Sequence, residues 1–274
     1  MAIVPSSKQL NGSHWYTQDG KPFHHIEENG KVRVTTLRDA RKYNLYPSVT
    51  SILNVLSKPG LEKWKLRQVT DVAFNNPSVQ LEEKTADSYN AKVVGMAFLK
   101  VHDAANLGKR IHHELDACTQ GKECTDNEIA KYIQGFLDWQ KDKDIKFTDT
   151  EVVVVNKEHG FAGRVDTFFQ YGKDGIGILD YKTRKFAKGE KPATYDNEAL
   201  QLAAYAASYY GEDRLSSVLA GNAYISSTSP GALFHIYKHN RLQEDWEAFK
   251  ALCGVWRYQM KYDPRKSKPL SMSI

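Results

Sequence analysis

The feature that most constrains the fold of this chain is a change of hydrophobic period between residues 142 and 151. Before it, apolar residues recur at helical spacing, whereas the run Glu151-Val152-Val153-Val154-Val155 is β-branched and apolar almost throughout. A run of that kind is typical of a strand covered on both faces. The pattern after it predicts strands at 161–170, 176–183, 217–226 and 232–238, and helices at 196–210 and 242–260.

The chain ahead of that change is predicted to be mostly helical, with a small β element near its start. Asp19-Gly20 and Asn29-Gly30 are hairpin signals, and helices are expected over about 48–56, 61–74, 91–119 and 126–142, while 76–90 stays ambiguous. We therefore expect an α/β core with a helical front end. The expected segments are an N-terminal arm and β-hairpin element (1–45), a helical region (46–145), an α/β core (146–262) and a C-terminal tail (263–274).

Composition narrows the possible classes of function. The chain has 274 residues and a formal net charge of +5, which permits a polyanionic partner without demanding one. No window approaches 18 consecutive apolar residues, so we expect no membrane partner. The 3 cysteines speak against a disulfide framework and suit a reducing compartment.

A predicted hairpin brings four charged residues together. If its loop is centred on Lys173, residues symmetric about that position face each other, so Asp166 lies opposite Asp180 and Arg164 opposite Lys182. Two carboxylates directly opposite repel, and a divalent cation between them would remove that cost; carboxylate oxygens suit Mg²⁺ or Mn²⁺. The alternative is an exposed hairpin in which Lys182 forms an ordinary ion pair.

Two helices offer further polar side chains. Gln201 and Tyr205 are four residues apart on an alanine-rich helix that should pack on the strand of Asp180. They either reach the site or a nucleic-acid backbone, or simply line an amphipathic face. His112 stands at the edge of an apolar helical stripe and either points at Asp166 and Asp180 or is a hydrogen-bonded core histidine.

Four other residues have open interpretations. Glu151, one strand before Asp166, is either an additional carboxylate of the site or a solvated residue at the start of a strand. Ser48 and Thr50 lie at a predicted helix N-terminus and are either phosphate contacts or plain caps. Among the basic residues near the hairpin, Arg164 is the one expected to contact phosphate.

Four short motifs occur in an order that resembles the RecB-like exonuclease branch of the PD-(D/E)XK nuclease superfamily. They are Gly-x-x-Ile-His ending at His112, Gly163-Arg164-Val165-Asp166, Asp180-Tyr181-Lys182-Thr183, and Gln-x-x-x-Tyr from Gln201 to Tyr205. The resemblance covers roughly residues 46–240. The segments 46–53 and 195–197 are similar to those of mitochondrial genome maintenance exonucleases and phage-encoded exonucleases.

The resemblance implies a restriction-endonuclease-like core, a mixed central sheet flanked by helices, as the nuclease core at 146–262. It also implies Mg²⁺ or Mn²⁺ as the cofactor. No iron–sulfur cluster is expected, because the four cysteines that hold one in some members are missing. The implied roles are metal ligation by His112, Asp166 and Asp180 with Glu151 as an additional carboxylate, catalysis by Lys182, and bracing of the site and contact with DNA by Gln201 and Tyr205.

The activity implied is metal-dependent exonuclease action on single-stranded DNA or DNA ends, in phage or bacterial replication, recombination or repair. DNA is the expected partner, and a single-strand annealing or recombination protein would fit as a second. The absence of a transit-like leader favours the cytoplasm of a bacterial or phage-infected cell. Three alternatives stay open: a structure- or sequence-selective endonuclease on the same core, a non-catalytic DNA-binding recombination accessory protein, and a metal-dependent hydrolase of small phosphate esters.

Overall fold

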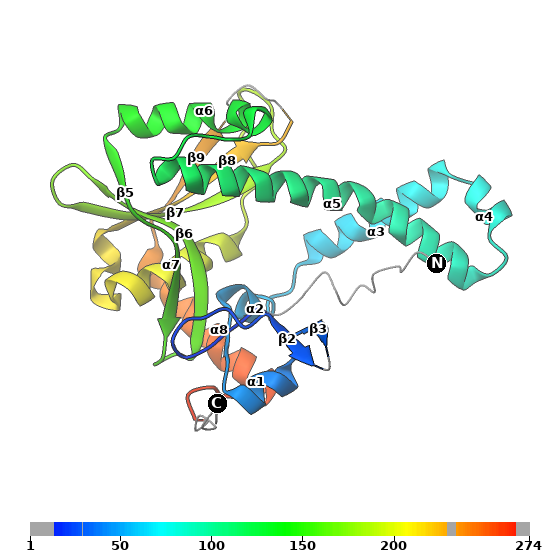
Figure 1. Ribbon diagram of the computed structural model, residues 1–274, viewed down its shortest axis with the longest axis horizontal. Coiled ribbons are helices and arrows are strands. Elements are labelled where there is room, and N and C mark those ends of the chain that lie inside the picture. Colours follow the sequence, from blue (N-terminus) through cyan, green and yellow to red (C-terminus); the bar gives the residue numbers. More distant parts are fainter. Residues whose placement is uncertain (1–13, 29, 229–233, 267–274) are drawn as a thin grey trace. The chain divides into compact units, whose positions relative to one another are not determined.

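The computed structural model describes residues 14–28, 30–228 and 234–266 (Figure 1). The expected arm at 1–13 and the end of the tail, from 267, lie outside the described residues. The chain divides into two compact units. Among the described residues, one unit contains 56–110, and the other contains 14–28, 30–55, 111–228 and 234–266.

The unit around residues 56–110 is helical. It contains α3 (Pro59–Asn75), α4 (Ser78–Glu82) and the first part of α5 (Ala86–Thr119). Pro59 lies in the first turn of α3, where its missing N–H costs nothing. α3 buries none of its residues, and the ambiguous segment 76–90 is α4 followed by the start of α5.

The second unit is built on a mixed five-stranded sheet in the order β5-β6-β7-β8-β9. β5, β6 and β7 are successive antiparallel strands, β7 and β8 are parallel, and β9 is antiparallel to β8. The parallel pair requires a crossover, which α7 (Asp196–Tyr210) and the 3₁₀ helix η2 (Glu212–Ser217) supply. The strands are β5 (Ile145–Asn156), β6 (Phe161–Tyr171), β7 (Gly175–Arg184), β8 (Val218–Ser226) and β9 (Phe234–His239).

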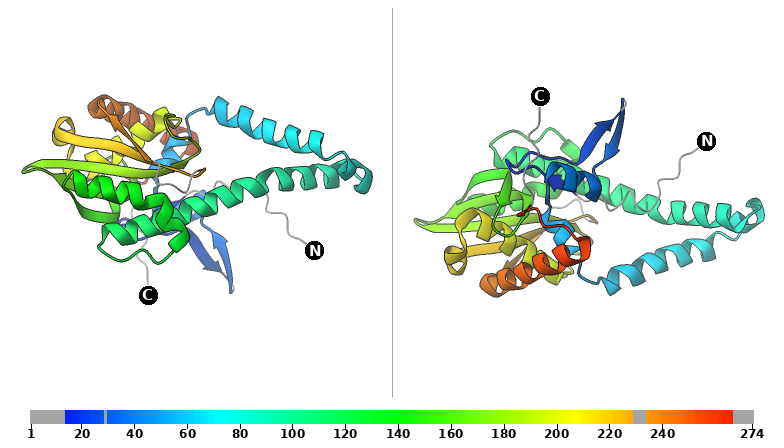
Figure 2. Two further views of the ribbon diagram at one scale, coloured as in Figure 1. Left: turned by 90° about the horizontal axis from the view of Figure 1, so that it is seen from above. Right: turned by 90° about the horizontal axis from the view of Figure 1, so that it is seen from below.

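Helices cover both faces of this sheet, so the fold is α/β with a mixed five-stranded sheet flanked by helices (Figures 1 and 2). On one face, Phe136 of α6 (Asn127–Asp142) stacks on Phe147 and meets the ring of Tyr181 edge-on. On the other face lie α7 and α8 (Leu242–Met260). α7 packs closely on its neighbours because many of its buried residues are small; they include Ala203, Ala204, Ala206 and Ala207.

A small N-terminal β element packs on the sheet. β1 (Trp15–Tyr16) pairs with β4 (Tyr46–Pro47), and β2 (His25–Glu28) forms a hairpin with β3 (Lys31–Val34). Tyr16 and Tyr46 pack against Ala162 of β6 and against Val153 and Val155 of β5. β2 and β3 pair as the predicted hairpin requires, although Asn29 of its turn lies outside the described residues. The element is fixed to the strands that lead to Asp166.

Two short helices connect this element to the core. α1 (Leu37–Tyr43) was not expected; it begins with a capping box in which Thr36 and Asp39 exchange side-chain and backbone hydrogen bonds. The guanidinium of Arg33 holds the pKa of Asp39 well below its ordinary value. α2 (Val49–Leu53) begins where the sequence predicts, with Ser48 as its cap.

The valine run lies in an edge strand. β5 pairs with β6 alone, and its Val153 and Val155 pack against the N-terminal β element. Val154 is buried, whereas Val152, Val153 and Val155 are half-buried. The strand is also irregular, because its register shifts between Phe147 and Asp149 and because Glu151 has a positive φ of 53°.

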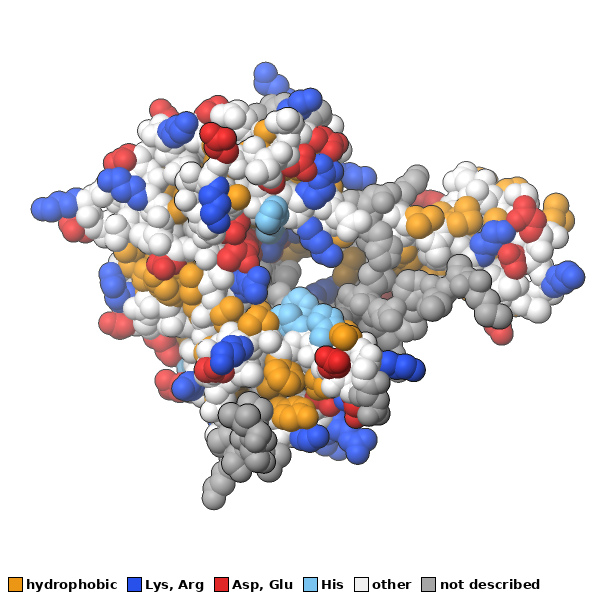
Figure 3. Space-filling view, in the orientation of Figure 1, with side chains coloured by type: hydrophobic (Ala, Val, Ile, Leu, Met, Phe, Trp, Pro, Cys, Tyr) orange, Lys and Arg blue, Asp and Glu red, His pale blue; other side chains and the backbone are white. Residues whose placement is uncertain are grey.

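The surface of the described residues is mixed in charge. On the face shown in Figure 3, Lys and Arg side chains alternate with Asp and Glu, which agrees with the mild formal excess of +5. No helix in the described part of the chain is long and apolar enough to cross a membrane.

We predict that His24 makes the fold acid-sensitive. Burial, with the nearby His14, lowers the pKa of His24 to about 4, and His24 Nδ1 accepts a hydrogen bond from Trp15 N–H at 3.2 Å. A histidine whose pKa falls on folding contributes stability that is complete above its unfolded pKa, near 6.5, and that is lost as pH falls toward 4. His24→Asn keeps an acceptor but does not titrate, so urea unfolding at stepped pH should show a flatter decline over this range. His25→Asn, at an exposed neighbour, is the control and should keep the wild-type decline; an unchanged decline in His24→Asn contradicts the prediction.

Candidate active site

The candidate site lies where β6 and β7 part. The two strands pair from Tyr171–Gly175 to Thr167–Leu179, in the register expected for a turn centred on Lys173. Asp166 and Asp180 are next in that register, but the ladder stops before them. Instead, the backbone N–H of Tyr181 donates to Asp166 Oδ2 at 2.6 Å, so both carboxylates sit at the opening of the two strands.

The two carboxylates are largely withdrawn from solvent, with side-chain exposures of 15% for Asp166 and 6% for Asp180. Burial raises the pKa of Asp166 well above its ordinary value, and the charge of Asp180 raises it further. Asp180 Oδ2 accepts a hydrogen bond from Asn222 Nδ2 at 2.7 Å. The pair is therefore not part of an exposed hairpin.

Lys182 supplies the neighbouring positive charge. Its Nζ lies 2.6 Å from Asp180 Oδ2 and donates to Gln201 Oε1 at 3.3 Å. Burial alone would lower the pKa of Lys182, but the charges of Asp180 and Asp166 outweigh it and the net pKa is raised. Lys182 is thus an ammonium held at the site, the form that stabilises negative charge on a bound substrate.

α7 contributes Gln201 and Tyr205, both buried. Gln201 Nε2 donates to the hydroxyl of Tyr205 at 3.2 Å, so Gln201 links Lys182 to Tyr205. The ring of Tyr205 lies over Gly163, where an added Cβ would fall 2.6 Å from Tyr205 Cε1. The glycine of the Gly163–Asp166 motif and the tyrosine of the Gln-x-x-x-Tyr motif are therefore one packing unit.

His112 and Glu151 approach the pair from different elements. His112 Nδ1 lies 3.8 Å from Asp166 Oδ2, its ring meets Tyr181 edge-on, and burial lowers the pKa of His112. Glu151 falls between the ladder pairs Thr150–Thr167 and Val152–Val165, opposite Asp166. The structure thus places both residues beside Asp166.

Arg164 is not where the sequence placed it. Because β6–β7 pairing ends at Thr167, Arg164 does not face Lys182; its Nη1 instead pairs with Glu151 Oε2 at 3.0 Å across β5 and β6. The expected four-residue patch therefore contains Asp166, Asp180 and Lys182 without Arg164. A phosphate contact by this half-exposed guanidinium stays a prediction.

Ser48 and Thr50 belong to a five-residue helix, α2. Ser48 is buried, and its Oγ accepts from Ser51 N–H at 3.0 Å, which is the capping alternative. Thr50 is exposed, and its hydroxyl lies 2.9 Å from Ser48 Oγ. A contact of either residue with DNA stays a prediction.

Sequence reasoning missed two groups that hold the site. Asn222 on β8 is fully buried beside Asp180. The sequence signal that could have identified it is a polar residue in the middle of a mostly apolar strand. Glu198 in the first turn of α7 is also buried; its Oε1 pairs with Arg184 Nη2 at 2.6 Å, and its Oε2 accepts from the hydroxyl of Tyr224. This second group ties the start of α7 to β7 and β8.

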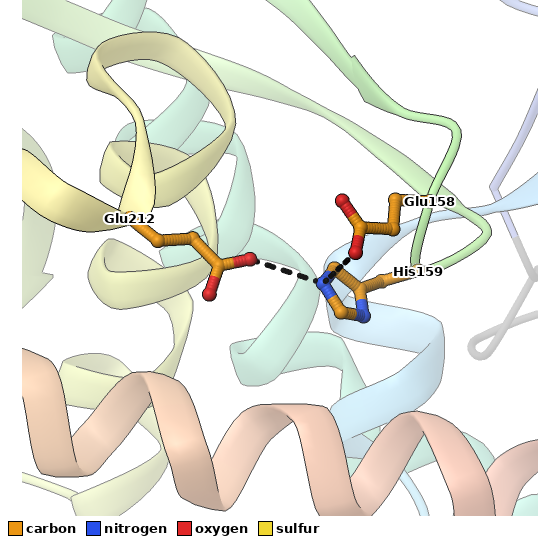
Figure 4. Close-up of side chains that lie close together, drawn as sticks. All are labelled: Glu158, His159 and Glu212. Atoms are coloured by element: carbon orange, nitrogen blue, oxygen red, sulfur yellow. Dashed lines mark hydrogen bonds and ion pairs between the residues drawn. The ribbon is translucent and has the colours of Figure 1, made fainter.

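One trio of possible metal ligands in the described residues has its ligand atoms within 4.8 Å of one another: Glu158, His159 and Glu212 (Figure 4). Both carboxylates approach the same nitrogen, His159 Nε2, at 3.9 and 3.1 Å. The other oxygen of Glu212 accepts from Lys250 Nζ at 3.3 Å. These contacts are those of an ion-pair network that joins the β5–β6 turn to η2 and α8.

Asp166 and Asp180 fit a divalent cation in a different way. Within the described residues the hydrogen bonds that Asp166 and Asp180 accept use Oδ2, so Oδ1 of each carboxylate has a hydrogen-bonding position left for a ligand. The raised pKa of Asp166 marks a buried negative pair that a cation would stabilise. Paired carboxylate oxygens suit Mg²⁺ or Mn²⁺, although nothing in the geometry selects one of them.

Comparisons with known proteins add little. No family model and no curated protein matches this chain. Sixteen chains of solved structures match it, among them the crystal structure of SSO0001, with 17% identity over 59% of this chain and 77% of that one and a TM-score of 0.31. A TM-score that low carries no argument about fold or function.

We predict that Gly163→Ala destabilises the fold by about 1–3 kcal/mol, because the new methyl group overlaps the ring of Tyr205. In a Tyr205→Ala background the same change should cost less than about 0.5 kcal/mol, and a double-mutant cycle in urea measures the difference. Gly254→Ala in α8, where a methyl group meets open space, is the control and should stabilise by up to ~1 kcal/mol. Equal costs of Gly163→Ala in both backgrounds would show that the two residues do not interact.

Proposed function

We propose that this chain is a metal-dependent deoxyribonuclease, an exonuclease of single-stranded DNA or DNA ends, on a restriction-endonuclease-like core. The observation that carries the proposal is the meeting of Asp166, Asp180 and Lys182 at the parting of two strands, with Gln201 joining them from α7. The motif resemblance supports it, because side chains from all four motifs lie around this one point.

Each of these residues has its own role in the proposed phosphodiester hydrolysis. Asp166 and Asp180 would hold Mg²⁺ or Mn²⁺, with His112 and Glu151 as further candidate ligands. When bound, such an ion polarises the phosphate and lowers the pKa of water. The ammonium of Lys182 donates to the charge that develops on the phosphate, and Gln201 and Tyr205 keep it in place.

The charge of the chain favours a polymer over a small phosphate ester. The formal charge is +5 even with the site carboxylates counted. With a cation bound to those carboxylates, the surface left for a phosphate backbone is more basic.

We predict that Lys182→Ala slows cleavage by at least roughly 10²-fold, the usual effect of removing one preorganised donor to a developing charge. The measurement is degradation of end-labelled single-stranded, duplex and closed circular DNA with Mg²⁺, with Mn²⁺ and with EDTA. The wild type should shorten linear DNA only with metal and should spare circles. Lys173→Ala, at the exposed turn of the same hairpin, is the control and should cleave at the wild-type rate.

Other outcomes point to the alternatives. Nicked circles would indicate an endonuclease on the same core. DNA binding without cleavage would indicate a non-catalytic recombination accessory protein, and hydrolysis of a chromogenic phosphodiester but not of DNA would indicate a small-ester hydrolase. Wild-type cleavage by Lys182→Ala would remove Lys182 from the mechanism.

A further inference from the structure

Three polar side chains form a chain of hydrogen bonds across the sheet behind the candidate site. Asp180 of β7 is in register with Asn222 of β8, whose Nδ2 donates to Asp180 Oδ2 at 2.7 Å. His239 of β9 places Nε2 2.7 Å from Asn222 Oδ1. Asn222 has no exposed surface, so these contacts replace water entirely.

The direction of both hydrogen bonds follows from the chemistry of the groups. The Asn222 amide turns its NH₂ group toward Asp180, because Asn222 Nδ2 donates to Asp180 Oδ2. Its carbonyl oxygen then faces His239, which therefore carries a proton on Nε2. His239 thus fixes the orientation of the amide, and the amide fixes the orientation of the carboxylate.

The consequence concerns which oxygen of Asp180 is left for a ligand. Asn222 and Lys182 both contact Oδ2. Within the described residues Oδ1 makes no hydrogen bond. A carboxylate locked in this way offers a defined ligand atom without reorganisation when a cation arrives.

We propose that Asn222 and His239 are positioning residues that orient Asp180 for a divalent cation. The inference rests on the proposed function, because it assigns Asp180 as a metal ligand. Partners of this kind behind a metal ligand typically change metal affinity or activity by 10–100-fold when they are replaced. His235 lies four residues before His239 on the same strand, opposite Tyr224. Within the described residues it makes no hydrogen bond to Asn222, so it offers a matched control.

The experiment measures binding of Mn²⁺ alone to the full chain by titration calorimetry, with the half-saturating Mn²⁺ concentration for DNA cleavage as a second readout. Asn222→Leu and His239→Phe should each weaken Mn²⁺ binding by roughly 10–100-fold. His239→Gln keeps a donor at the position of Nε2 and should stay within about threefold of the wild type, because the hydrogen bond to Asn222 is retained. His235→Phe should bind Mn²⁺ as the wild type does.

The outcomes separate the two proposals. If the wild type neither binds Mn²⁺ nor cleaves DNA, the proposed function fails. If the wild type does both, while His239→Phe and Asn222→Leu bind Mn²⁺ with unchanged affinity, the positioning role is overturned. It is also overturned if His239→Gln binds Mn²⁺ as weakly as His239→Phe does. An equal loss of affinity with and without a hydrogen-bond donor at this position indicates a packing role. Should Asn222→Leu not fold, the comparison of the two His239 variants still decides.

Discussion

The parting of β6 and β7 beyond Thr167–Leu179 is the constraint on which the rest of the site depends. Had the ladder continued, Asp166 and Asp180 would lie as an ordinary cross-strand pair of like charges, which is destabilising. The opening lets Tyr181 N–H donate a hydrogen bond to one oxygen of Asp166, and it lets Lys182 form an ion pair with one oxygen of Asp180. What remains is a buried pair with two oxygens unused and the pKa of Asp166 raised, an arrangement that a divalent cation would stabilise.

The surrounding elements hold that opening from two sides. α7 packs against it because Gly163 leaves room for the ring of Tyr205. Gln201 of the same helix hydrogen-bonds to both Tyr205 and Lys182, and so holds Lys182 in place. β8 lies on the other side of β7, and its Asn222 holds Asp180. Buried polar groups are favourable only when their partners are complete, so these networks make the site stiff as well as charged.

The local part of this architecture could be predicted from sequence, and the non-local part could not. A short turn centred on Lys173 sets the register of its own two strands. The ladder up to Thr167–Leu179, directly beyond which Asp166 and Asp180 lie, therefore follows from counting residues. The partner of Arg164 depends on where that ladder stops, and the positive φ of Glu151 depends on an irregularity of the edge strand β5. Neither the end of a ladder nor a strand irregularity leaves a periodic signal in the sequence. Asn222 reaches Asp180 through a parallel pairing set by the packing of a long crossover, which sequence spacing does not specify.

The most direct test of this account is anomalous scattering from Mn²⁺ in crystals of the wild-type protein. The account predicts a Mn²⁺ peak beside the carboxylates of Asp166 and Asp180, and its loss in Asp180→Asn. A peak confined to Glu158, His159 and Glu212, or none at Asp166 and Asp180 in a crystal that binds Mn²⁺ elsewhere, would contradict it.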